Sequence, residues 1–386
     1  MAAVLLDVSR LLHRLLKQKL PTGVDRVGLE YVRHYSVRPD TRAVLSEAGM
    51  SVVLSSSQSK RAFELLLEQN FASSNKVRKL IVEAACRVLR NDNFMQATLL
   101  HTSHSGIERA RYMHAMKRRG IRTVAMVHDL IPLTHAEYCR PAVDATHRQR
   151  MHSALRHAHG IIANSKYTLD TLDDEAHTAG LCVPSAVVAH LAPGLELRAR
   201  VKRLIDVPYF VMLGTIEPRK NHWLMLQVWR RLVEQLGDAA PKLVIIGRRG
   251  WECENAVDML ERSAPLKQAV IEEADCNDER LQAWLQHAQA LLFPSFVEGY
   301  GMPLVEALTL GVPVLASDLD VFHEIAGDIP EYLDPLDGPC WLQSIRAYSD
   351  PSNTARNAQI ARIKDFQAPT WQQHFDVVDR FIEALR

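Results

Sequence analysis

The sequence has few cysteines, and none of them lie close together. Its 386 residues include six, at positions 86, 139, 182, 253, 276 and 340, with no C-x-x-C pair. Zinc sites and disulfide frameworks depend on such spacings, so neither is expected, and scattered thiols fit the reducing cytoplasm. The sequence also lacks any run of about 18 apolar residues, which a membrane-spanning helix requires. Its first ten residues turn polar too early for a signal peptide and predict a buried strand at Val4–Val8.

The net charge is also small, at +1, but the charged residues are unevenly distributed along the chain. Residues 1–195 hold 26 of the 46 basic and 17 of the 45 acidic side chains, so residues 196–386 hold the other 20 and 28. The length favours two domains, and the opposite charges of the halves suggest different partners for each. A basic first half suits an anionic partner, namely a membrane surface, a phospholipid-linked acceptor or nucleic acid.

One stretch of the basic half, Ser9–Leu20, has the pattern of a short amphipathic helix. Its five leucines share one helical face, and most of its basic side chains lie elsewhere. Such a helix can lie in a bilayer interface or pack on its own domain, and the pattern leaves both interpretations open.

Buried-strand patterns alternate with helical patterns along the whole chain, which is typical of Rossmann-like domains. The helical patterns include residues 58–90, Ile107–Arg119 and an amphipathic segment at Trp371–Ile382. The predicted strands are Val4–Val8, Ala43–Leu45, Val52–Leu54, Thr98–His101, Thr123–Val127, Gly160–Ala163, Val187–His190, Tyr209–Leu213, Leu243–Ile246, Val270–Glu272, Leu291–Phe293 and Val314–Ala316.

The most informative stretch reads LLFPSFVEGYGMPLVEALTLGVPVLASD, from Leu291 to Asp318. Apolar runs at Ala290–Phe293 and Val312–Ala316 predict buried parallel strands. Between them a glycine-rich turn precedes a helix of about Met302–Leu310, with proline near its start and glycine after its end. The N-terminus of this helix would face a ligand at the carboxyl end of a strand, and its backbone N–H groups suit an anion.

Two carboxylates, Glu298 and Glu306, lie on this turn and helix, eight positions apart. Phosphate would repel them, but a carboxylate accepts paired hydrogen bonds from a sugar diol such as ribose. One solvated and one capping glutamate would explain the spacing equally well.

The same stretch closely resembles the signature of the family 4 glycosyltransferases, which are retaining enzymes. The match is P-S-F-V-E-G-Y-G-M-P-L-V-E-A from Pro294 to Ala307, followed by G-V-P-V at Gly311–Val314. The resemblance implies an α/β protein of the GT-B class, with two Rossmann-like domains facing across a cleft. We therefore expect an N-terminal acceptor-binding domain at 1–194, a nucleotide-sugar-binding domain at 195–368, and a C-terminal helix at 369–386 that crosses back to the first domain.

Further segments are similar to motifs of this family. Gly214–Asn221 contains the R-K-N segment, Gly247–Trp251 reads G-R-R-G-W, and Val127–Pro132 reads V-H-D-L-I-P. The loop Pro21–Arg26 matches the family's glycine-rich loop only at Gly23 and Arg26, and residues 36–97 match no motif.

The resemblance also implies roles for individual residues. Arg219 and Lys220 would grip the donor diphosphate, Glu306 the ribose, and Glu298 and His128 the sugar. The implied catalytic residues are His128, Glu298, Arg219 and Lys220. The implied donor-binding residues are Gly23, Arg219, Lys220, Glu298, Gly299, Tyr300, Gly301, Met302 and Glu306. Thr22, Arg26 and Asp129 are assigned to the acceptor or its loop. No metal ligand is expected, because the D-x-D at Asp318–Asp320 lies where the family has an ordinary loop.

The implied activity is transfer of a hexose, with retention and without a metal or other cofactor, from a nucleoside diphosphate sugar to a hydroxyl. GDP-mannose is the leading donor, by similarity to bacterial polysaccharide mannosyltransferases. The expected acceptor is a glycan or a polyprenyl-diphosphate-linked oligosaccharide of cell-surface polysaccharide synthesis. We expect no nucleic-acid partner, and a cytoplasmic protein peripheral to the inner face of the membrane.

Other functions remain compatible with this fold. A nucleotide-sugar epimerase would act without an acceptor, and a partner protein would bind the nucleotide sugar without catalysis. A phosphorylase would need a pyridoxal lysine, for which the sequence offers no segment.

Overall fold

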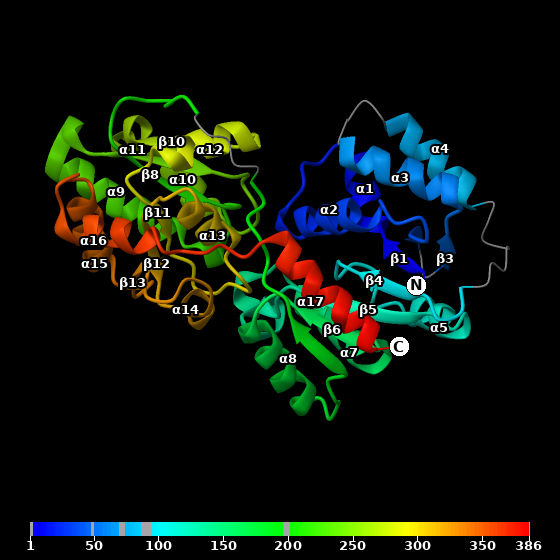
Figure 1. Ribbon diagram of the computed structural model, residues 1–386. Coiled ribbons are helices and arrows are strands. Elements are labelled where there is room, and N and C mark those ends of the chain that lie inside the picture. Colours follow the sequence, from blue (N-terminus) through cyan, green and yellow to red (C-terminus); the bar gives the residue numbers. More distant parts are fainter. Residues whose placement is uncertain (1–2, 48–49, 69–73, 86–93, 196–200, 386) are drawn as a thin grey trace. The chain divides into compact units, whose positions relative to one another are not determined.

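The computed structural model describes residues 3–47, 50–68, 74–85, 94–195 and 201–385, which form two units (Figure 1). The first comprises Met1–Leu133, Ala142–Leu191 and Thr370–Arg386, and the second Thr134–Pro141 and Ala192–Pro369. One short segment departs from the predicted division, because residues 134–141 join the second unit although they lie within the first half of the sequence. The end of the helical run predicted up to residue 90 lies outside the described residues.

The first unit is built on a seven-stranded sheet in the order β3-β2-β1-β4-β5-β6-β7. All neighbouring strands are parallel except β2 and β3, which form an antiparallel pair at one edge. The strands are β1 (Val4–Asp7), β2 (Arg42–Glu47), β3 (Met50–Val53), β4 (Thr98–His101), β5 (Arg122–Val127), β6 (Gly160–Ala163) and β7 (Ser185–Val188). Every predicted strand of this half is present, with its ends shifted by a few residues at most.

Helices flank this sheet, and the first four of them gather on one side (Figure 1). They are α1 (Ser9–Leu16), α2 (Gly23–Tyr35), α3 (Ser56–Glu68), α4 (Ser74–Ala85), α5 (Ala110–Arg118), α6 (Ile131–Thr134), α7 (Val143–His157), α8 (Lys166–Thr178) and α17 (Trp371–Ala384). Helix α5 begins three residues later than predicted, because the chain is still in a turn at Gly106 and extended at Arg109.

Helix α1 packs on its own unit. Leu11, Leu12 and Leu15 are buried, and the helix ends at Leu16, before Gln18 adopts a left-handed conformation. The predicted helix to Leu20 is therefore too long. These three of the five leucines belong to the core, and insertion of this face into a bilayer would require the helix to unpack.

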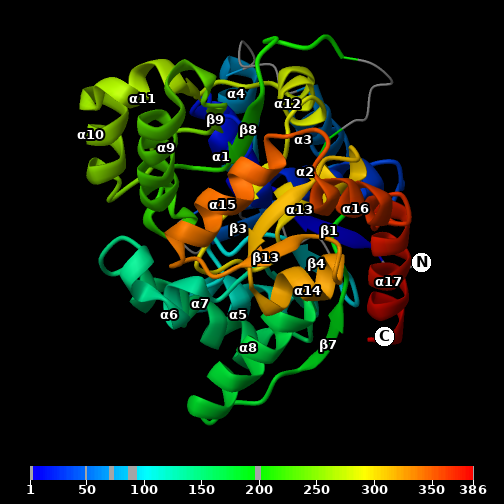
Figure 2. The same ribbon diagram turned by 90° about the vertical axis from the view of Figure 1, so that its left-hand side faces the viewer.

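Helix α17 belongs to the first unit and lies beside β7 (Figure 2). Phe375 and Val378 are buried, and the ring of His34 stacks on Phe375 at 3.8 Å. Asp379 accepts a hydrogen bond of 2.7 Å from the Tyr35 hydroxyl and pairs with Arg38 of the same unit. Helix α17 thus packs against the end of α2 within the first unit.

The second unit has a six-stranded, fully parallel sheet in the order β10-β9-β8-β11-β12-β13. The strands are β8 (Tyr209–Leu213), β9 (Lys242–Ile246), β10 (Val270–Glu273), β11 (Leu291–Phe293), β12 (Val314–Ser317) and β13 (Glu331–Leu333). Edge strand β13 was not predicted, because three residues with a single buried side chain leave no periodic signal. Strand β12 begins after Pro313, which has no N–H to donate to the ladder.

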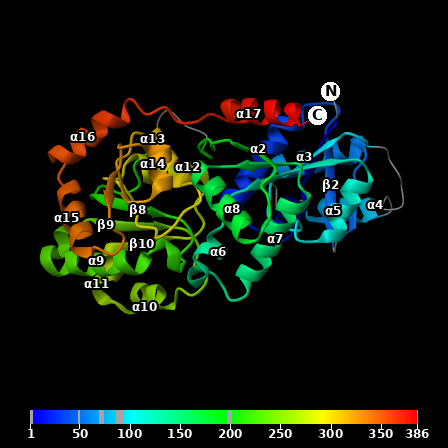
Figure 3. The same cartoon turned by 90° about the horizontal axis from the view of Figure 1, so that it is seen from below.

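Helices cover both faces of this sheet. Figure 2 shows α9, α10 and α11 together, and Figure 3 shows α13 beside α14. The helices are α9 (His222–Leu236), α10 (Glu254–Arg262), α11 (Ala264–Ala269), α12 (Asp278–Gln286), α13 (Met302–Thr309), α14 (Asp320–Ala326), α15 (Gly338–Tyr348) and α16 (Thr354–Ile363), with short 3-10 turns at η3 (Pro218–Lys220) and η4 (Gly237–Ala239). Among the described residues no helix is long and apolar enough to cross a bilayer.

Candidate functional site

The loop after β8 carries the two predicted donor-binding cations. It passes through η3, and Asn221 adopts a left-handed conformation before α9 begins. Two hydrogen bonds hold it, from Asn221 Nδ2 to the Pro335 carbonyl at 2.8 Å and from the Phe296 N–H to the Arg219 carbonyl at 2.8 Å. The second bond joins the loop after β8 to the loop after β11, so both loops converge at the carboxyl edge of the sheet, where open α/β sheets bind ligands.

Glu298 lies at the centre of a buried charge cluster. Its Oε1 is 2.5 Å from Lys220 Nζ and 2.7 Å from Arg219 Nη1. Arg219 Nε also lies 2.6 Å from Glu217 Oε1, which completes a set of two cations and two carboxylates. Glu298 Oε2 makes no hydrogen bond or ion pair to any residue in the described ranges. One oxygen of this carboxylate therefore holds the cations, and the other remains available to a ligand.

Burial and charge act against each other at this cluster. Burial by itself would raise the pKa of Glu298, but Arg219 and Lys220 outweigh it and lower this pKa to about 2. Burial lowers the pKa of Lys220, although Glu298 opposes this change, and burial raises the pKa of Glu217. Glu298 is consequently ionised at neutral pH, and it holds both cations in fixed positions.

The glycine-rich turn that follows Glu298 is buried and leads directly into α13. Gly299, Tyr300 and Gly301 are buried, and Gly301 has a φ of +117°, which favours glycine. Met302 is the first residue of α13. One turn further on, Glu306 is 4% exposed, and its Oε1 accepts a hydrogen bond of 3.3 Å from the Gly194 N–H. The second predicted carboxylate thus lies within the second unit, against the segment that enters it.

Close backbone packing fixes the loop after β9. A Cβ on Gly247 would lie 1.9 Å from the carbonyl oxygen of Gly214, and one on Gly250 would lie 2.6 Å from Thr215 Cγ2. Only glycine permits these approaches. The G-R-R-G-W turn is thereby held against the loop that carries Arg219 and Lys220.

Residues 134–141 supply an aromatic contact that the sequence did not predict. Tyr138 stacks on Phe296 with a centroid distance of 5.2 Å, and its carbonyl accepts a hydrogen bond of 3.1 Å from Trp251 Nε1. The guanidinium of Arg140 lies over the Trp251 ring. The family motifs contain Trp251 and Phe296, but nothing in the sequence marks Tyr138 as their partner.

In the first unit, His128 directly follows β5 and is 5% exposed. Its Nε2 lies 2.8 Å from the Thr102 carbonyl, and its own carbonyl accepts a hydrogen bond of 2.9 Å from Asn164 Nδ2. Asp129 is half-buried and accepts a hydrogen bond from the Ile131 N–H at 3.2 Å. His128 thus occupies the predicted position at the carboxyl edge of the first sheet.

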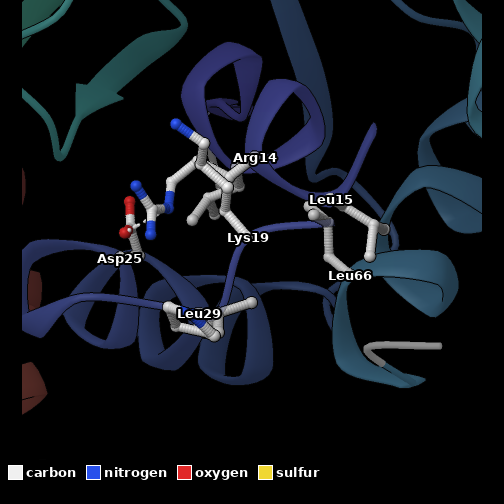
Figure 4. A pocket seen from close by; sticks show the side chains of 8 residues that line it. Arg14, Leu15, Lys19, Asp25, Leu29 and Leu66 are labelled. Carbon is white, nitrogen blue, oxygen red and sulfur yellow. Dashed lines mark ion pairs between the residues drawn. The ribbon is translucent and has the colours of Figure 1, made fainter. Parts of the chain in front are cut away.

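The predicted acceptor loop is organised by Asp25, a buried residue that the sequence did not single out. Its Oδ2 accepts hydrogen bonds from the N–H and hydroxyl of Thr22, at 2.8 and 2.6 Å, which caps α2 at Gly23. Arg10 and Arg14 each lie 2.7 Å from this carboxylate. Figure 4 shows Arg14 directed toward Asp25 beside a small pocket that is also lined by Lys19 and Leu29. Two arginines of α1 thus hold this loop, while the neighbouring Arg26 is half-buried.

Comparisons with known proteins agree with this arrangement. Residues 196–329 match the family model described as glycosyl transferases group 1. The chain is 27% identical over 252 residues to the serotype-specific mannosyltransferase WbdA of Escherichia coli, covering 61% of this chain and 30% of that protein. It is 35% identical over 130 residues to the O-antigen chain mannosyltransferase B of Escherichia coli, covering 33% of each.

The second unit contains a group 1 glycosyltransferase domain.

A solved structure shares the fold of this chain over almost its whole length. Anabaena Alr3699/HepE in complex with UDP-glucose has a TM-score of 0.65 and 14% sequence identity, covering 99% of both chains. The predicted GT-B fold and the resemblance to glycosyltransferases are confirmed. The chain spans about a third of the length of the curated relatives that it matches first.

The group 1 domain brings together most of the predicted donor residues. Arg219, Lys220 and Glu298 touch one another, and the turn and helix that bear Gly299 to Glu306 follow in sequence. The other predicted site residues lie in the first unit. They are His128, Asp129, Thr22, Gly23 and Arg26.

The D-x-D sequence of this domain connects β12 to α14. Asp318 Oδ1 lies 2.7 Å from His323 Nε2, and Asp320 is the first residue of α14. Across the described ranges of the chain, no group of three acidic, histidine or cysteine side chains is arranged to hold a metal ion.

Proposed function

We propose that this chain is a retaining glycosyltransferase that moves a hexose from a nucleoside diphosphate sugar to a hydroxyl group. The observation that carries this proposal is the convergence of Arg219, Lys220 and Glu298 beside the turn that leads into α13. Fixed cations and a helix N-terminus provide complementary charge for a diphosphate, and a carboxylate oxygen suits sugar hydroxyls.

The proposed chemistry breaks the bond between the anomeric carbon and the diphosphate. Negative charge grows on the leaving diphosphate while positive charge grows on the sugar ring. Arg219, Lys220 and the first N–H groups of α13 stabilise the negative charge, and this interaction strengthens toward the transition state. No protein nucleophile is assigned, since the leaving phosphate accepts the proton of the attacking hydroxyl on the same face of the sugar.

Further residues complete the proposed site. Glu306 accepts hydrogen bonds from the ribose, and Glu298 Oε2 accepts them from the sugar. The turn Gly299–Met302 lies against the phosphates, His128 contacts the transferred sugar, and Gly23 contacts the donor. Thr22, Arg26 and Asp129 serve the acceptor. We propose that the reaction needs no metal, because the oriented cations and the first N–H groups of α13 would contact the diphosphate.

GDP-mannose is the proposed donor, supported by the mannosyltransferase names of the relatives in Escherichia coli. The proposed acceptor is a glycan or a polyprenyl-diphosphate-linked oligosaccharide in cell-surface polysaccharide synthesis. We also propose a cytoplasmic location, with attraction of the basic first half to the anionic inner face of the membrane. UDP sugars are the main competitors, since HepE was solved with UDP-glucose.

A thermal-shift titration tests this proposal first. GDP, UDP, dTDP and their common sugars would each be added without metal and with EDTA. A ligand at 100 times its dissociation constant adds about 2.7 kcal/mol of stability, which is readily measured. We expect one nucleoside diphosphate to stabilise the chain in EDTA and to lose this effect in Lys220→Ala. A response to none of them, or only with a divalent metal, would contradict the proposed site.

Product analysis separates the remaining functions. A transferase releases nucleoside diphosphate only when an acceptor is present, whereas an epimerase changes the nucleotide sugar by itself. A binding protein shows the thermal shift without turnover.

A further inference from the structure

The backbone on either side of His128 is held by side chains from three other parts of the first unit. The His128 N–H donates to His104 Nε2 at 3.0 Å. The His128 carbonyl accepts from Asn164 Nδ2 at 2.9 Å, and the Asp129 carbonyl accepts from His147 Nε2 at 3.1 Å. His104 follows β4, His147 lies on α7 and Asn164 follows β6. Side chains thus hydrogen-bond to three backbone groups of two adjacent residues, so the position of the buried His128 is closely specified.

These bonds determine which ring nitrogens carry protons. A backbone N–H can only donate, so His104 Nε2 must carry a lone pair. A carbonyl oxygen can only accept, so His128 Nε2, at 2.8 Å from the Thr102 carbonyl, must carry the proton. A neutral His128 therefore has its lone pair on Nδ1, which makes no hydrogen bond to any residue of the described ranges.

The surroundings keep these rings neutral. Burial lowers the pKa of His128 and of His147, and it lowers the pKa of His104 well below its ordinary value. The nearby acids Asp129 and Asp25 favour the protonated form of His128, and Arg10 opposes it. Arg150 and His101 act on His104 in the same direction as burial. A neutral His104 keeps the lone pair on Nε2 that accepts the His128 N–H, and a neutral His128 keeps the lone pair on Nδ1.

We propose that His104 is a positioning residue: by accepting the backbone N–H of His128, it holds that histidine so that the unprotonated Nδ1 accepts a hydrogen bond from a hydroxyl of the transferred sugar. This inference rests on the proposed function, since it gives a chemical role to the histidine that contacts the sugar. It adds a residue that lies in none of the family motifs, and it makes His128 a neutral acceptor instead of a cation.

The ring assignments are tested in the unmodified protein. Long-range proton–nitrogen NMR of the full chain distinguishes the two neutral forms of each histidine. Comparison with His128→Gln and His104→Gln identifies their signals among the seventeen histidines. We expect the proton of His128 on Nε2 and that of His104 on Nδ1 at pH 7. Protonation of His128 on Nδ1, or a doubly protonated ring, overturns the proposal, and this measurement requires no variant to be active.

Two matched variants test the positioning role. His104→Gln retains an acceptor the same number of bonds from the backbone, whereas His104→Met has similar size without a good acceptor. We expect His104→Met to lower kcat/KM roughly 10- to 100-fold, because a small misplacement of a reacting group has effects of this size. We expect His104→Gln to remain within about threefold of the unmodified enzyme, because it restores the hydrogen bond.

The same experiment separates this inference from the proposed function. Nucleoside diphosphate binding, followed by thermal shift, depends on the second unit and should be the same in both variants. If neither variant nor the unmodified chain binds nucleotide, the proposed function fails. If nucleotide binds and His104→Met is as active as His104→Gln, the proposed function stands and the role of His104 is wrong. Should His104→Met fail to fold, the NMR assignment still decides.

Discussion

Lys220 Nζ lies 2.5 Å from Glu298 Oε1, so a predicted diphosphate-binding cation is paired with a predicted sugar-binding carboxylate. Arg219 shares the same oxygen, and Glu217 balances Arg219. The four side chains carry no net charge. Donor binding at this site would therefore depend on the fixed orientation of the cations, with Glu298 as the residue that orients them.

Replacing Lys220 by alanine should impair the proposed reaction severely. The change removes one cation from the leaving diphosphate and leaves the buried Glu298 with Arg219 alone. We expect kcat to fall by a factor of about 100 to 1000, as for loss of one transition-state contact. The release of nucleoside diphosphate in the presence of acceptor measures this. Arg231→Ala, an exposed cation on α9, is the control and should remain fully active. A Lys220→Ala enzyme that stays as active as this control would contradict the assignment.

Glu298→Gln should flatten the acid side of the stability profile. Because its folded pKa of about 2 lies below its ordinary value near 4.5, the carboxylate stabilises the fold above pH 4.5. This stabilisation is lost as the pH falls toward 2. We expect the variant to be less stable at pH 7 by something on the order of 3 kcal/mol, and the difference to shrink near pH 3.

Urea unfolding at several pH values measures this difference. Burial alone would raise the pKa of Asp379, but hydrogen bonds from His34, Arg38 and Tyr35 lower it to about 2. Asp379 titrates equally in both proteins. Its contribution therefore cancels in the comparison. Parallel curves for the two proteins between pH 7 and pH 3 would show that Glu298 does not carry this stabilisation.

Gly247→Ala should disrupt the group 1 domain. Its new Cβ would lie 1.9 Å from the Gly214 carbonyl oxygen, so the loops after β8 and β9 would have to separate. Gly311→Ala is the matched control, because Gly311 also has a positive φ but open space around its Cβ. The control should lose roughly 1–2 kcal/mol from backbone strain alone. We expect Gly247→Ala to lose clearly more and to bind nucleotide poorly. Equal losses in thermal unfolding would rule out the clash as the cause.

Leu12→Ala should destabilise the first unit by about 2–5 kcal/mol, since Leu12 is a buried core residue of α1. The exposed Leu20, just beyond this helix, provides the control, and Leu20→Ala should have little effect on stability. Chemical unfolding measures both. Binding to vesicles that contain anionic lipid should not depend on Leu12 beyond its effect on folding. A loss of vesicle binding at unchanged stability would instead show that α1 inserts into bilayers.

Much of this protein follows from its sequence, because strand and helix patterns are local and motif residues lie close together in the chain. The alternation of apolar strands with helices predicted the strands of both sheets except the three-residue β13. The apolar runs at Ala290–Phe293 and Val312–Ala316, with the glycines and proline between them, predicted two parallel strands, the turn and helix α13. The sequence also placed Glu298 directly before that turn and Glu306 on the helix after it.

Tertiary structure alone decided which charges and rings meet. Basic residues of α1 resembled a membrane-binding face in sequence, but Arg10 and Arg14 pair with Asp25, and three of the four leucines of α1 are buried. Glu298 pairs with Lys220, 78 positions away, and His104 holds the backbone of His128 across two neighbouring strands. Such partners are far apart in sequence and are set by the packing of strands and loops, so no local pattern could have indicated them.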